Sequence, residues 1–342
     1  MTLPGDPELA ALAHALDSGA LPLSDPARVA VLNARPGSGL PLPGWRLFQD
    51  DAALAAALQA QGGQVAGTDA VQGGFDCAVV LAPRSRDLCR ILLARAASVS
   101  AAGTVVAVAG NQSGAGALQT DLKALAGPPC SLAKHRCKVL WSAPGAAVDS
   151  ELRARWAALD APVRNAEGWW SRPGLFAWDR VDPGSALLAA SLPADLSGSA
   201  ADLGAGFGFL AGSLLRRCPA IASIDLFESD RRALDPARLN LAACAGGRQA
   251  RLHWHDVTAG IPGRYDLIVS NPPFHARDRA DRPELGQAFI AAAAAALVPG
   301  GSLWLVANRH LPYEAILAAR FRDVRVVAEE AGYKVLQGEA PR

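Results

Sequence analysis

The sequence predicts an α/β protein made of two tandem, doubly wound domains that arose by internal duplication. Its 342 residues exceed the usual range for one domain, about 100 to 200 residues. In both halves, short apolar runs alternate with alanine- and leucine-rich stretches of helical length, a pattern typical of a parallel sheet covered on both faces. We expect a first domain over residues 1–150 and a second over residues 166–342, with a short helix near residues 150–159 in the connection.

The duplication is visible as three segments that recur in the same order and at a nearly constant offset. In the first pair, an aromatic–Asp dipeptide enters a buried strand that ends at proline, and the second and third pairs read as later strands of each half. The matching pairs are residues 75–83 with 265–273, residues 103–109 with 301–307, and residues 137–140 with 333–336.

No segment predicts export or insertion into a membrane. Hydrophobic residues make up 51% and charged residues 19% of the chain, as in compact globular domains. The N-terminus lacks a basic region followed by an apolar stretch, and the longest apolar run, residues 288–298, is shorter than the about 20 residues that a membrane span needs. We therefore expect a cytoplasmic protein that does not enter a membrane.

The cysteines and histidines do not predict a metal site. No two of the six cysteines form a C-x-x-C pair, so buried thiols are the favoured interpretation. His253, His255 and Asp256 lie close in sequence, but no further cluster of ligands accompanies them. We expect no bound metal. The cysteines are Cys77, Cys89, Cys130, Cys137, Cys218 and Cys244.

A net charge of +1 gives no broad basic surface, so a nucleic-acid partner would have to be held by local arginine clusters. A solvated helix or loop face explains each cluster equally well, and both interpretations stay open. The clusters are Arg84, Arg86, Arg90 and Arg95 in the first half, and Arg277, Arg279 and Arg282 in the second.

A glycine-rich loop at residues 201–210 (ADLGAGFGFL) predicts a cofactor site in the second half, between a strand and a helix. Glycines at alternate positions lack the Cβ atoms that would keep backbone away from a ligand, and they allow positive φ. We expect this backbone to lie directly against the cofactor. The residues concerned are Leu203, Gly204, Ala205, Gly206 and Gly208.

Three carboxylates favour an adenosine cofactor with a cationic amino-acid group. Glu228 ends the next predicted strand, where a carboxylate can accept both ribose hydroxyl protons, and Asp256 follows the third strand, within reach of an adenine amino group. Asp202 directly precedes the glycines and suits a cation better than a pyrophosphate. Residues 206–211 also satisfy the G-x-G-x-x-A form of a nicotinamide fingerprint, an alternative that Asp202 disfavours.

Residues 266–275 (DLIVSNPPFH) predict chemistry on a planar amine. The lone pair of such an amine is delocalised, so the nitrogen must become more tetrahedral before it attacks a sulfonium methyl group. The Asn271 side-chain oxygen and the Pro272 carbonyl can each accept one N–H, while Pro272 and Pro273 stiffen the turn. Phe274 offers a face on which a flipped-out base can stack. An ordinary strand-terminating turn is the alternative.

These motifs carry a resemblance. Residues 172–342 resemble the catalytic half of the ribosomal RNA guanine-N2 methyltransferases, the RsmC/RlmG-like family, and within it most closely the small-subunit (16S) enzymes. The matching stretches are residues 173–176 (PGLF), residues 182–188 (DPGSALL), the glycine loop, residues 270–275 (SNPPFH), residues 306–313 (VANRHLPY) and residues 332–336 (GYKVL).

The resemblance implies two Rossmann-like class I methyltransferase domains, with S-adenosyl-L-methionine as cofactor and the exocyclic N2 amine of a guanine in 16S ribosomal RNA as the methyl acceptor. It also implies a degenerate N-terminal domain that supports folding and holds RNA, because residues 31–39 lack the glycine pattern and residues 81–84 (LAPR) lack the asparagine. Asp182 and Ser185 would border the methionine end of the cofactor. We expect a monomer.

Four alternatives remain open on the sequence. A methyltransferase acting on guanine N2 of 23S ribosomal RNA, or on a protein glutamine amide, would use the same pocket. A nicotinamide-dependent oxidoreductase would use the glycine loop differently. A catalytically inactive RNA-binding assembly protein is disfavoured, because the second half keeps the motif residues that the first half has lost.

Overall fold

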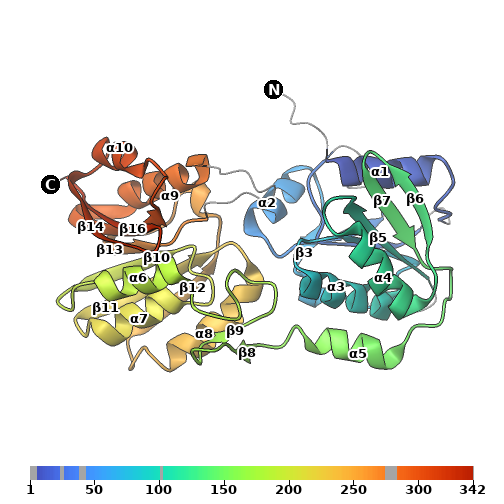
Figure 1. The fold of residues 1–342 in the computed structure, drawn as a ribbon, viewed down its shortest axis with the longest axis horizontal. Helices are drawn as coiled ribbons and strands as arrows, with labels where there is room; N and C mark the ends of the chain where they lie inside the picture. The colour runs from blue at the N-terminus through green and yellow to red at the C-terminus, as the bar shows by residue number, and fades with distance from the viewer. Residues whose placement is uncertain (1–5, 24–26, 38–43, 101–102, 274–282, 342) are drawn as a thin grey trace. The chain divides into compact units, whose positions relative to one another are not determined.

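The computed structural model describes residues 6–23, 27–37, 44–100, 103–273 and 283–341. The chain forms two compact units, residues 1–161 and residues 162–342. Each unit contains a seven-stranded sheet with helices on both faces (Figure 1). None of the helices described is both long and apolar enough to cross a membrane.

In the first unit the strand order is β3-β2-β1-β4-β5-β7-β6. All neighbouring strands are parallel except β7, which is antiparallel to both of its neighbours. The elements are α1 (Pro7–Asp17), β1 (Val29–Leu32), β2 (Trp45–Phe48), α2 (Ala52–Ala60), β3 (Val65–Ala66), the 3-10 helix η1 (Thr68–Ala70), β4 (Cys77–Leu81), α3 (Arg86–Val99), β5 (Thr104–Gly110), α4 (Ala115–Ala126), β6 (Cys130–Lys134), β7 (Cys137–Trp141) and α5 (Ser150–Ala158).

The second unit repeats this order as β12-β11-β10-β13-β14-β16-β15, with β16 antiparallel to both neighbours. A two-stranded sheet of β8 (Val163–Arg164) and β9 (Trp170–Ser171) precedes it. The remaining elements are α6 (Pro183–Ser191), β10 (Gly198–Leu203), α7 (Phe209–Arg217), β11 (Ile221–Glu228), η2 (Arg231–Ala233), α8 (Leu234–Ala242), β12 (Gln249–Trp254), η3 (Val257–Ala259), β13 (Tyr265–Ser270), α9 (Pro283–Ala296), β14 (Leu297–Asn308), α10 (Tyr313–Ala318), β15 (Arg322–Glu330) and β16 (Tyr333–Glu339).

The predicted fold class and duplication are confirmed. The three pairs of matching segments lie on β4 and β13, on β5 and β14, and on β7 and β16, which hold the same places in the two sheets. The first match has a structural cause in its aspartate. Asp76 accepts the backbone N–H of Arg28 at 2.9 Å, and Asp266 accepts that of Ser199 at 2.8 Å. In each unit this aspartate fastens the start of the fourth strand to the start of the first.

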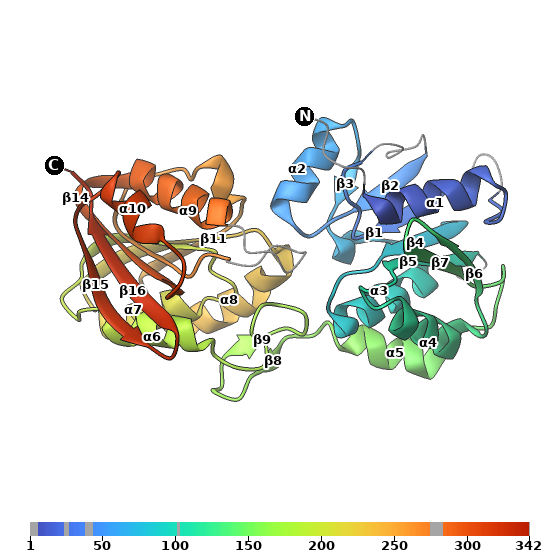
Figure 2. The same ribbon diagram turned by 45° about the horizontal axis from the view of Figure 1, so that its top comes forward.

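Alternating side chains of the second sheet build two core layers. Ala201 and Leu203 of β10 pack toward α9 and α10, whereas Ala200 packs toward α6, α7 and α8. Figures 1 and 2 show these two groups of helices on opposite faces of the sheet. Because both faces are covered, ligands can approach the sheet only at its edges, where the strands end.

The helix expected in the connection belongs to the first unit. It is α5, which packs on α3 and buries Trp156 in the core of that unit. The unit therefore extends to residue 161 rather than 150. Five of the six cysteines are buried free thiols, as predicted, and Cys130 is exposed.

Candidate active site

The glycine loop connects the end of β10 to the start of α7. Gly204 has a φ of +71° and Gly206 one of +53°, which explains the need for glycine. The N–H groups of Gly204 and Ala205 both donate to the Phe227 carbonyl, at 2.9 and 3.2 Å, so the loop is held to the end of β11. A Cβ placed on Gly206 would meet no heavy atom of the described residues within 4 Å. The loop therefore borders open space.

Asp202 lies fully buried beneath this loop. Its Oδ2 accepts the Ala211 N–H at 3.0 Å, at the start of α7. Its Oδ1 is buried without a hydrogen-bond partner among the described residues. Burial raises the pKa of Asp202 to about 7, against the effect of the Ala211 hydrogen bond, and the negative charge of Glu228 adds to the rise. A cationic ligand group would satisfy this carboxylate.

Glu228 ends β11 and is nearly buried. One of its carboxylate oxygens accepts the Gly206 N–H at 2.7 Å and the other accepts the Asp230 N–H at 2.7 Å. Each carboxylate oxygen can accept more than one hydrogen bond. Glu228 is thus anchored by backbone, with its carboxylate beside the glycine loop.

Asp256 lies two residues beyond the end of β12, at the same edge of the sheet. It caps η3, since its Oδ1 accepts the Thr258 N–H at 2.9 Å, and both of its oxygens accept from the Thr258 hydroxyl. Its side chain is half-buried. These bonds fix the carboxylate in place, and its contact with an adenine stays a prediction.

The end of β13 brings Asn271 to the glycine loop. The Ser270 hydroxyl donates to the Leu203 carbonyl at 2.8 Å, which joins β13 to β10 where both strands end. A Cβ placed on Gly204 would lie 4.0 Å from the Asn271 carbonyl oxygen. The predicted catalytic turn and the predicted cofactor loop are therefore neighbours.

The Asn271 side chain is held by two residues from the start of α6. Its Nδ2 donates to Asp182 Oδ2 at 2.9 Å and to Ser185 Oγ at 2.8 Å. The expectation for Asp182 and Ser185 was a place beside the methionine end of the cofactor, and sequence reasoning missed their contact with Asn271. The available signal was the helix start Asp-Pro-x-Ser, which presents a carboxylate and a hydroxyl on one turn.

The rest of the predicted catalytic turn is described in part. Pro272 is buried and Pro273 is exposed. Phe274, the predicted stacking residue, lies outside the described residues. Stacking on a base therefore remains a prediction.

In the first unit the equivalent positions have different residues. In the first unit Leu32 lies between Phe48 and Val80 of the neighbouring strands. In the second unit Leu203 lies in the same way between Phe227 and Ser270. These strand pairs fix the register between the two units, and the residues that replace the predicted site residues follow from it. They are Val31 for Asp202, Asn33 for Gly204, Arg35 for Gly206, Gln49 for Glu228 and Leu81 for Asn271.

A cluster of charged side chains forms at the position of the missing glycine. Arg35 forms an ion pair with Asp6 at 3.2 Å and another with Glu8, both at the start of α1. Glu8 is buried and also accepts the Gly110 N–H at 2.8 Å, at the end of β5. We call Asp6, Glu8 and Arg35 the ion-pair cluster. It fastens α1 to the edge of the sheet at which the second unit has its glycine loop.

The first arginine cluster is already paired with carboxylates. Arg86 and Arg90 both donate to the buried Asp121, at 3.0 and 3.1 Å from their Nε atoms, and Arg95 pairs with Asp160. Three of these guanidinium groups therefore stabilise the first unit, and phosphate would have to compete with aspartate for them. The second arginine cluster lies outside the described residues. Its members are Arg277, Arg279 and Arg282.

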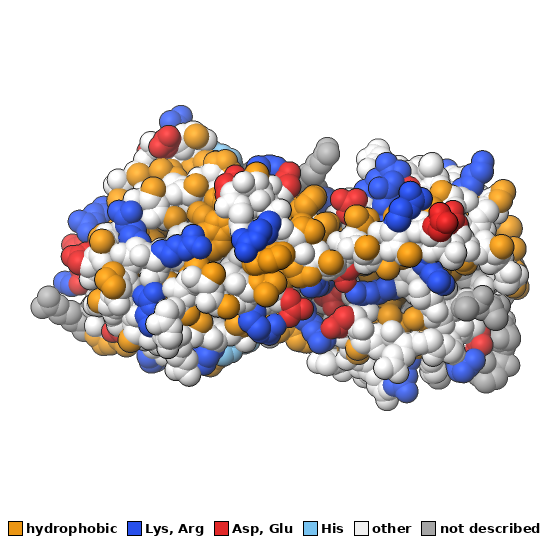
Figure 3. Space-filling model, turned by 90° about the horizontal axis from the view of Figure 1, so that it is seen from below, with side chains coloured by type: hydrophobic (Ala, Val, Ile, Leu, Met, Phe, Trp, Pro, Cys, Tyr) orange, Lys and Arg blue, Asp and Glu red, His pale blue; other side chains and the backbone are white. Residues whose placement is uncertain are grey.

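Figure 3 shows one face, on which Lys and Arg side chains are scattered among Asp, Glu and apolar residues rather than gathered in one patch.

His253 stacks on Phe227 and lies 3.1 Å from the Asp225 carboxylate. No group of three or more His, Cys, Asp or Glu side chains suited to a metal ion occurs in the part of the chain that the structure describes.

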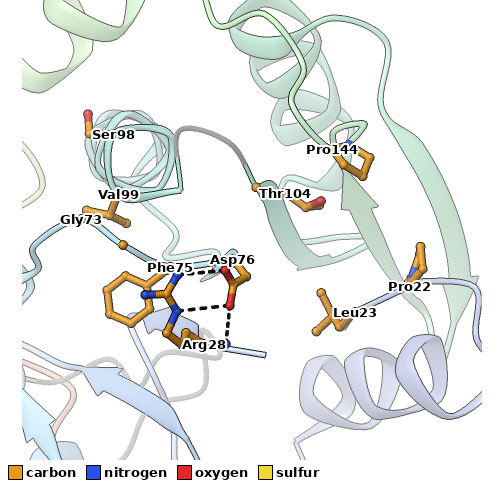
Figure 4. A pocket seen from close by; sticks show the side chains of 12 residues that line it. Pro22, Leu23, Arg28, Gly73, Phe75, Asp76, Ser98, Val99, Thr104 and Pro144 are labelled. Carbon is orange, nitrogen blue, oxygen red and sulfur yellow. Dashed lines mark hydrogen bonds and ion pairs between the residues drawn. The ribbon is translucent and has the colours of Figure 1, made fainter. Parts of the chain in front are cut away.

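A separate cavity of about 590 Å³ lies in the first unit, at the opposite edge of the sheet, where β4 and β5 start (Figure 4). Phe75, Asp76 and Thr104 line it, together with Arg28, whose guanidinium bonds the Asp76 carboxylate. None of the residues that line it belongs to the predicted cofactor or catalytic sets.

Comparison with known proteins identifies the family. The methyltransferase small domain family matches residues 168–337, within the second unit. The ribosomal RNA small subunit methyltransferase C of Pseudomonas aeruginosa is 34% identical over 271 residues, which cover 78% of this chain and 80% of the relative. The chain belongs to the ribosomal RNA small subunit methyltransferase C family. The family member from Shewanella amazonensis is 31% identical over 277 residues, 76% of each protein.

Among solved structures, a methyltransferase C from T. thermophilus matches 98% of this chain and 92% of its own, with a TM-score of 0.78 and 26% identity. It is described as the 16S rRNA N2 G1207 methyltransferase in complex with AdoMet and guanosine. The family predicted from the motifs is therefore confirmed, S-adenosylmethionine is the cofactor of a methyltransferase C of this fold, and the nicotinamide oxidoreductase alternative is wrong.

Proposed function

We propose that this protein transfers a methyl group from S-adenosylmethionine to the exocyclic N2 amine of a guanine in 16S ribosomal RNA. The supporting observation is the meeting of Asn271 with the glycine loop at one sheet edge, in a chain of the methyltransferase C family. The T. thermophilus relative, solved with AdoMet and guanosine, supports the same choice of cofactor and base.

The residues around the glycine loop fit this cofactor. The unpaired oxygen of Asp202 would accept from the ammonium group of the methionine moiety, and Glu228 would accept from the ribose hydroxyls. The backbone from Leu203 to Gly206 would line the pocket, and Asp256 would accept from the adenine amino group. Once bound, S-adenosylmethionine supplies an electrophilic methyl group on its sulfonium.

Two acceptors of this chain prepare the guanine amine. The Asn271 side-chain oxygen and the Pro272 carbonyl each accept one N–H, which makes the nitrogen more tetrahedral and directs its lone pair out of the ring plane. Phe274 would hold the extruded base by stacking. No strong general base is required, because the amine loses its proton to solvent after it has gained the methyl group.

We assign no second active site to the first unit. Val31 replaces the buried carboxylate and Leu81 replaces the amide acceptor, while the ion-pair cluster lies at the position of the loop glycine. The proposed roles of the first unit are to support folding of the second unit and to hold RNA. We expect a cytoplasmic monomer that acts on the small ribosomal subunit.

The test uses labelled S-adenosylmethionine and separated small and large subunits from a host whose ribosomes lack this methylation. Label on a guanine N2 of the small subunit is the expected result, and Asn271→Ala should abolish it while leaving cofactor affinity nearly unchanged. Label on the large subunit or on a protein glutamine would replace the proposal by one of the alternatives. Full activity of Asn271→Ala would disprove the mechanism.

A further inference from the structure

The catalytic asparagine needs a defined orientation. A carboxamide has an acceptor oxygen and a donor nitrogen of almost the same shape, which exchange places when the group rotates by half a turn. Only the oxygen can accept an N–H from the substrate. In one orientation the Asn271 side chain prepares the amine for attack, and in the other it repels the amine.

We propose that Asp182 and Ser185 are positioning residues that hold the Asn271 amide with its oxygen toward the substrate amine. The Asn271 NH₂ group donates to Asp182 Oδ2 at 2.9 Å and to Ser185 Oγ at 2.8 Å, so both of its protons have partners. Its Oδ1 accepts no hydrogen bond from any described residue. This inference rests on the proposed function of the site.

Charge makes this orientation the stable one. A half-turn of the amide would place Asn271 Oδ1 against the Asp182 carboxylate oxygen, where two acceptors repel each other. Hydrogen bonds to an ionised acceptor are about twice as strong as those between neutral groups. The carboxylate therefore selects the donor end of the amide, and the Ser185 hydroxyl takes its second proton.

The two acceptors are rigid because they belong to one helix start. Asp182 caps α6, since the Oδ2 atom that faces Asn271 also accepts the Ser185 N–H at 2.9 Å. Between them, Gly184 leaves no room for a side chain, because a Cβ there would lie 2.8 Å from the Tyr333 ring. The first turn of α6 is thus pressed against the start of β16, and both acceptors are fixed relative to the sheet.

The first unit provides an internal comparison. Its helix α1 begins with Asp6-Pro7 as α6 begins with Asp182-Pro183, and the Asp6 side chain accepts the N–H groups of Glu8 and Leu9. Position 9 corresponds to Ser185. Where Leu81 has replaced the asparagine, the helix cap is kept and the hydroxyl is gone. The Ser185 hydroxyl is therefore not needed to cap the helix. This supports its proposed role of accepting a hydrogen bond from Asn271.

The first experiment compares Ser185→Ala with Ser191→Ala in the full-length protein. Ser191 lies on the same helix, and within the described part of the chain its hydroxyl bonds only the Leu187 carbonyl of that helix. We expect Ser185→Ala to lower kcat about tenfold, the effect of one lost hydrogen bond, with KM and Kd for S-adenosylmethionine unchanged. We expect Ser191→Ala to match the wild type. Equal kcat in both variants would overturn the inference.

The second experiment exchanges donor and acceptor. Asn271→Asp keeps an acceptor for the substrate but places a carboxylate beside Asp182, so we expect kcat to fall by about 100-fold. Adding Asp182→Asn removes the repulsion between the two carboxylates and lets an amide N–H at position 182 donate to the carboxylate at position 271. Because Asp182 Oδ2 both faces Asn271 and accepts the Ser185 N–H, this exchange gives up that capping hydrogen bond. The double variant should recover at least about tenfold over Asn271→Asp. Full activity of Asn271→Asp alone, or a folded double variant without recovery, would overturn the inference.

A readout independent of turnover separates this inference from the proposed function. With ¹⁵N-labelled asparagine, the Asn271 side-chain NH₂ protons should exchange slowly with water in the wild type and in Ser191→Ala, and faster in Ser185→Ala. Fast exchange in the wild type would refute the positioning. A wild type with protected amide protons that methylates no guanine in either subunit would refute the proposed function and leave the positioning supported.

Discussion

The Glu228 carboxylate accepts the Gly206 backbone N–H at 2.7 Å, so the residue that ends β11 also fixes the glycine loop. Its first-unit counterpart, Gln49, does comparable work with an amide. Gln49 accepts the N–H groups of Asp50 and Asp51, each at 2.8 Å, and donates to the Ala34 carbonyl at 2.6 Å. Gln49 accepts both N–H groups with one oxygen, whereas Glu228 uses one oxygen for Gly206 and the other for Asp230, so an amide at position 228 would keep only one of these two bonds.

We predict that Glu228→Gln binds S-adenosylmethionine at least about tenfold more weakly, because hydrogen bonds from hydroxyls to a charged acceptor are stronger than those to a neutral one and because the new NH₂ group cannot accept one of the two backbone N–H groups. Calorimetric titration gives the affinity, and thermal melting checks the fold. Gln49→Glu is the matched control in the first unit and should leave the affinity unchanged. Wild-type affinity in Glu228→Gln would remove Glu228 from the cofactor site.

The pKa of Asp202, about 7 in the free protein, predicts how cofactor affinity depends on pH. The folded-state pKa is raised above that of the unfolded chain, so Asp202 stabilises the free fold below about pH 4 and this contribution is lost as pH rises through 7. A bound ammonium group favours the ionised carboxylate. Affinity for S-adenosylmethionine should therefore rise with pH, by up to about tenfold per unit, and level off above pH 7.

Asp202→Asn assigns this effect to Asp202. The amide oxygen can still accept the Ala211 N–H, so the start of α7 keeps its hydrogen bond. We expect weaker binding that no longer changes between pH 5.5 and pH 8 in calorimetric titrations. A slope that persists in Asp202→Asn would show that Asp202 does not cause it.

The fold and the outline of the site were predictable from local patterns. The three repeated segments gave the equivalent strands because buried strands keep their apolar pattern after duplication. The glycine loop, Glu228 and the Asn-Pro-Pro turn each follow a strand, and parallel strands end at one edge. Their meeting therefore followed from strand order alone.

The contacts that orient the site were not predictable in this way. The helix start Asp-Pro-x-Ser indicates that Asp182 and Ser185 share one turn, but their contact with Asn271 depends on how α6 packs against the sheet, which a local pattern does not encode. Arg35 was also missed, because the connection between the first two strands is shorter in the first unit and lacks a counterpart of α7 among its described residues. Without a gap-free match, the register of that loop could not be predicted.

Arg35 yields the last prediction, on stability. Its guanidinium lies between Asp6 and Glu8, and its side chain is 21% exposed. Arg35→Ala would leave two neighbouring carboxylates without a cation, one of them nearly buried. We expect the free energy of unfolding to fall by about 2 to 3 kcal/mol, below the full cost of breaking a buried pair because solvent reaches the site.

Arg28→Ala is the matched control in the same unit, because its pair with Asp76 is solvent-exposed and the Arg28 backbone N–H that Asp76 accepts is kept. That variant should unfold in urea almost like the wild type. Hydrogen exchange should show that the loss of stability in Arg35→Ala is concentrated in α1 and β1. The ion-pair cluster joins the first turn of α1 to the segment that follows β1. Cofactor affinity should stay at the wild-type value, because Asp202, Gly206 and Glu228 belong to the second unit. A weaker affinity would show that the first unit contributes to the cofactor site.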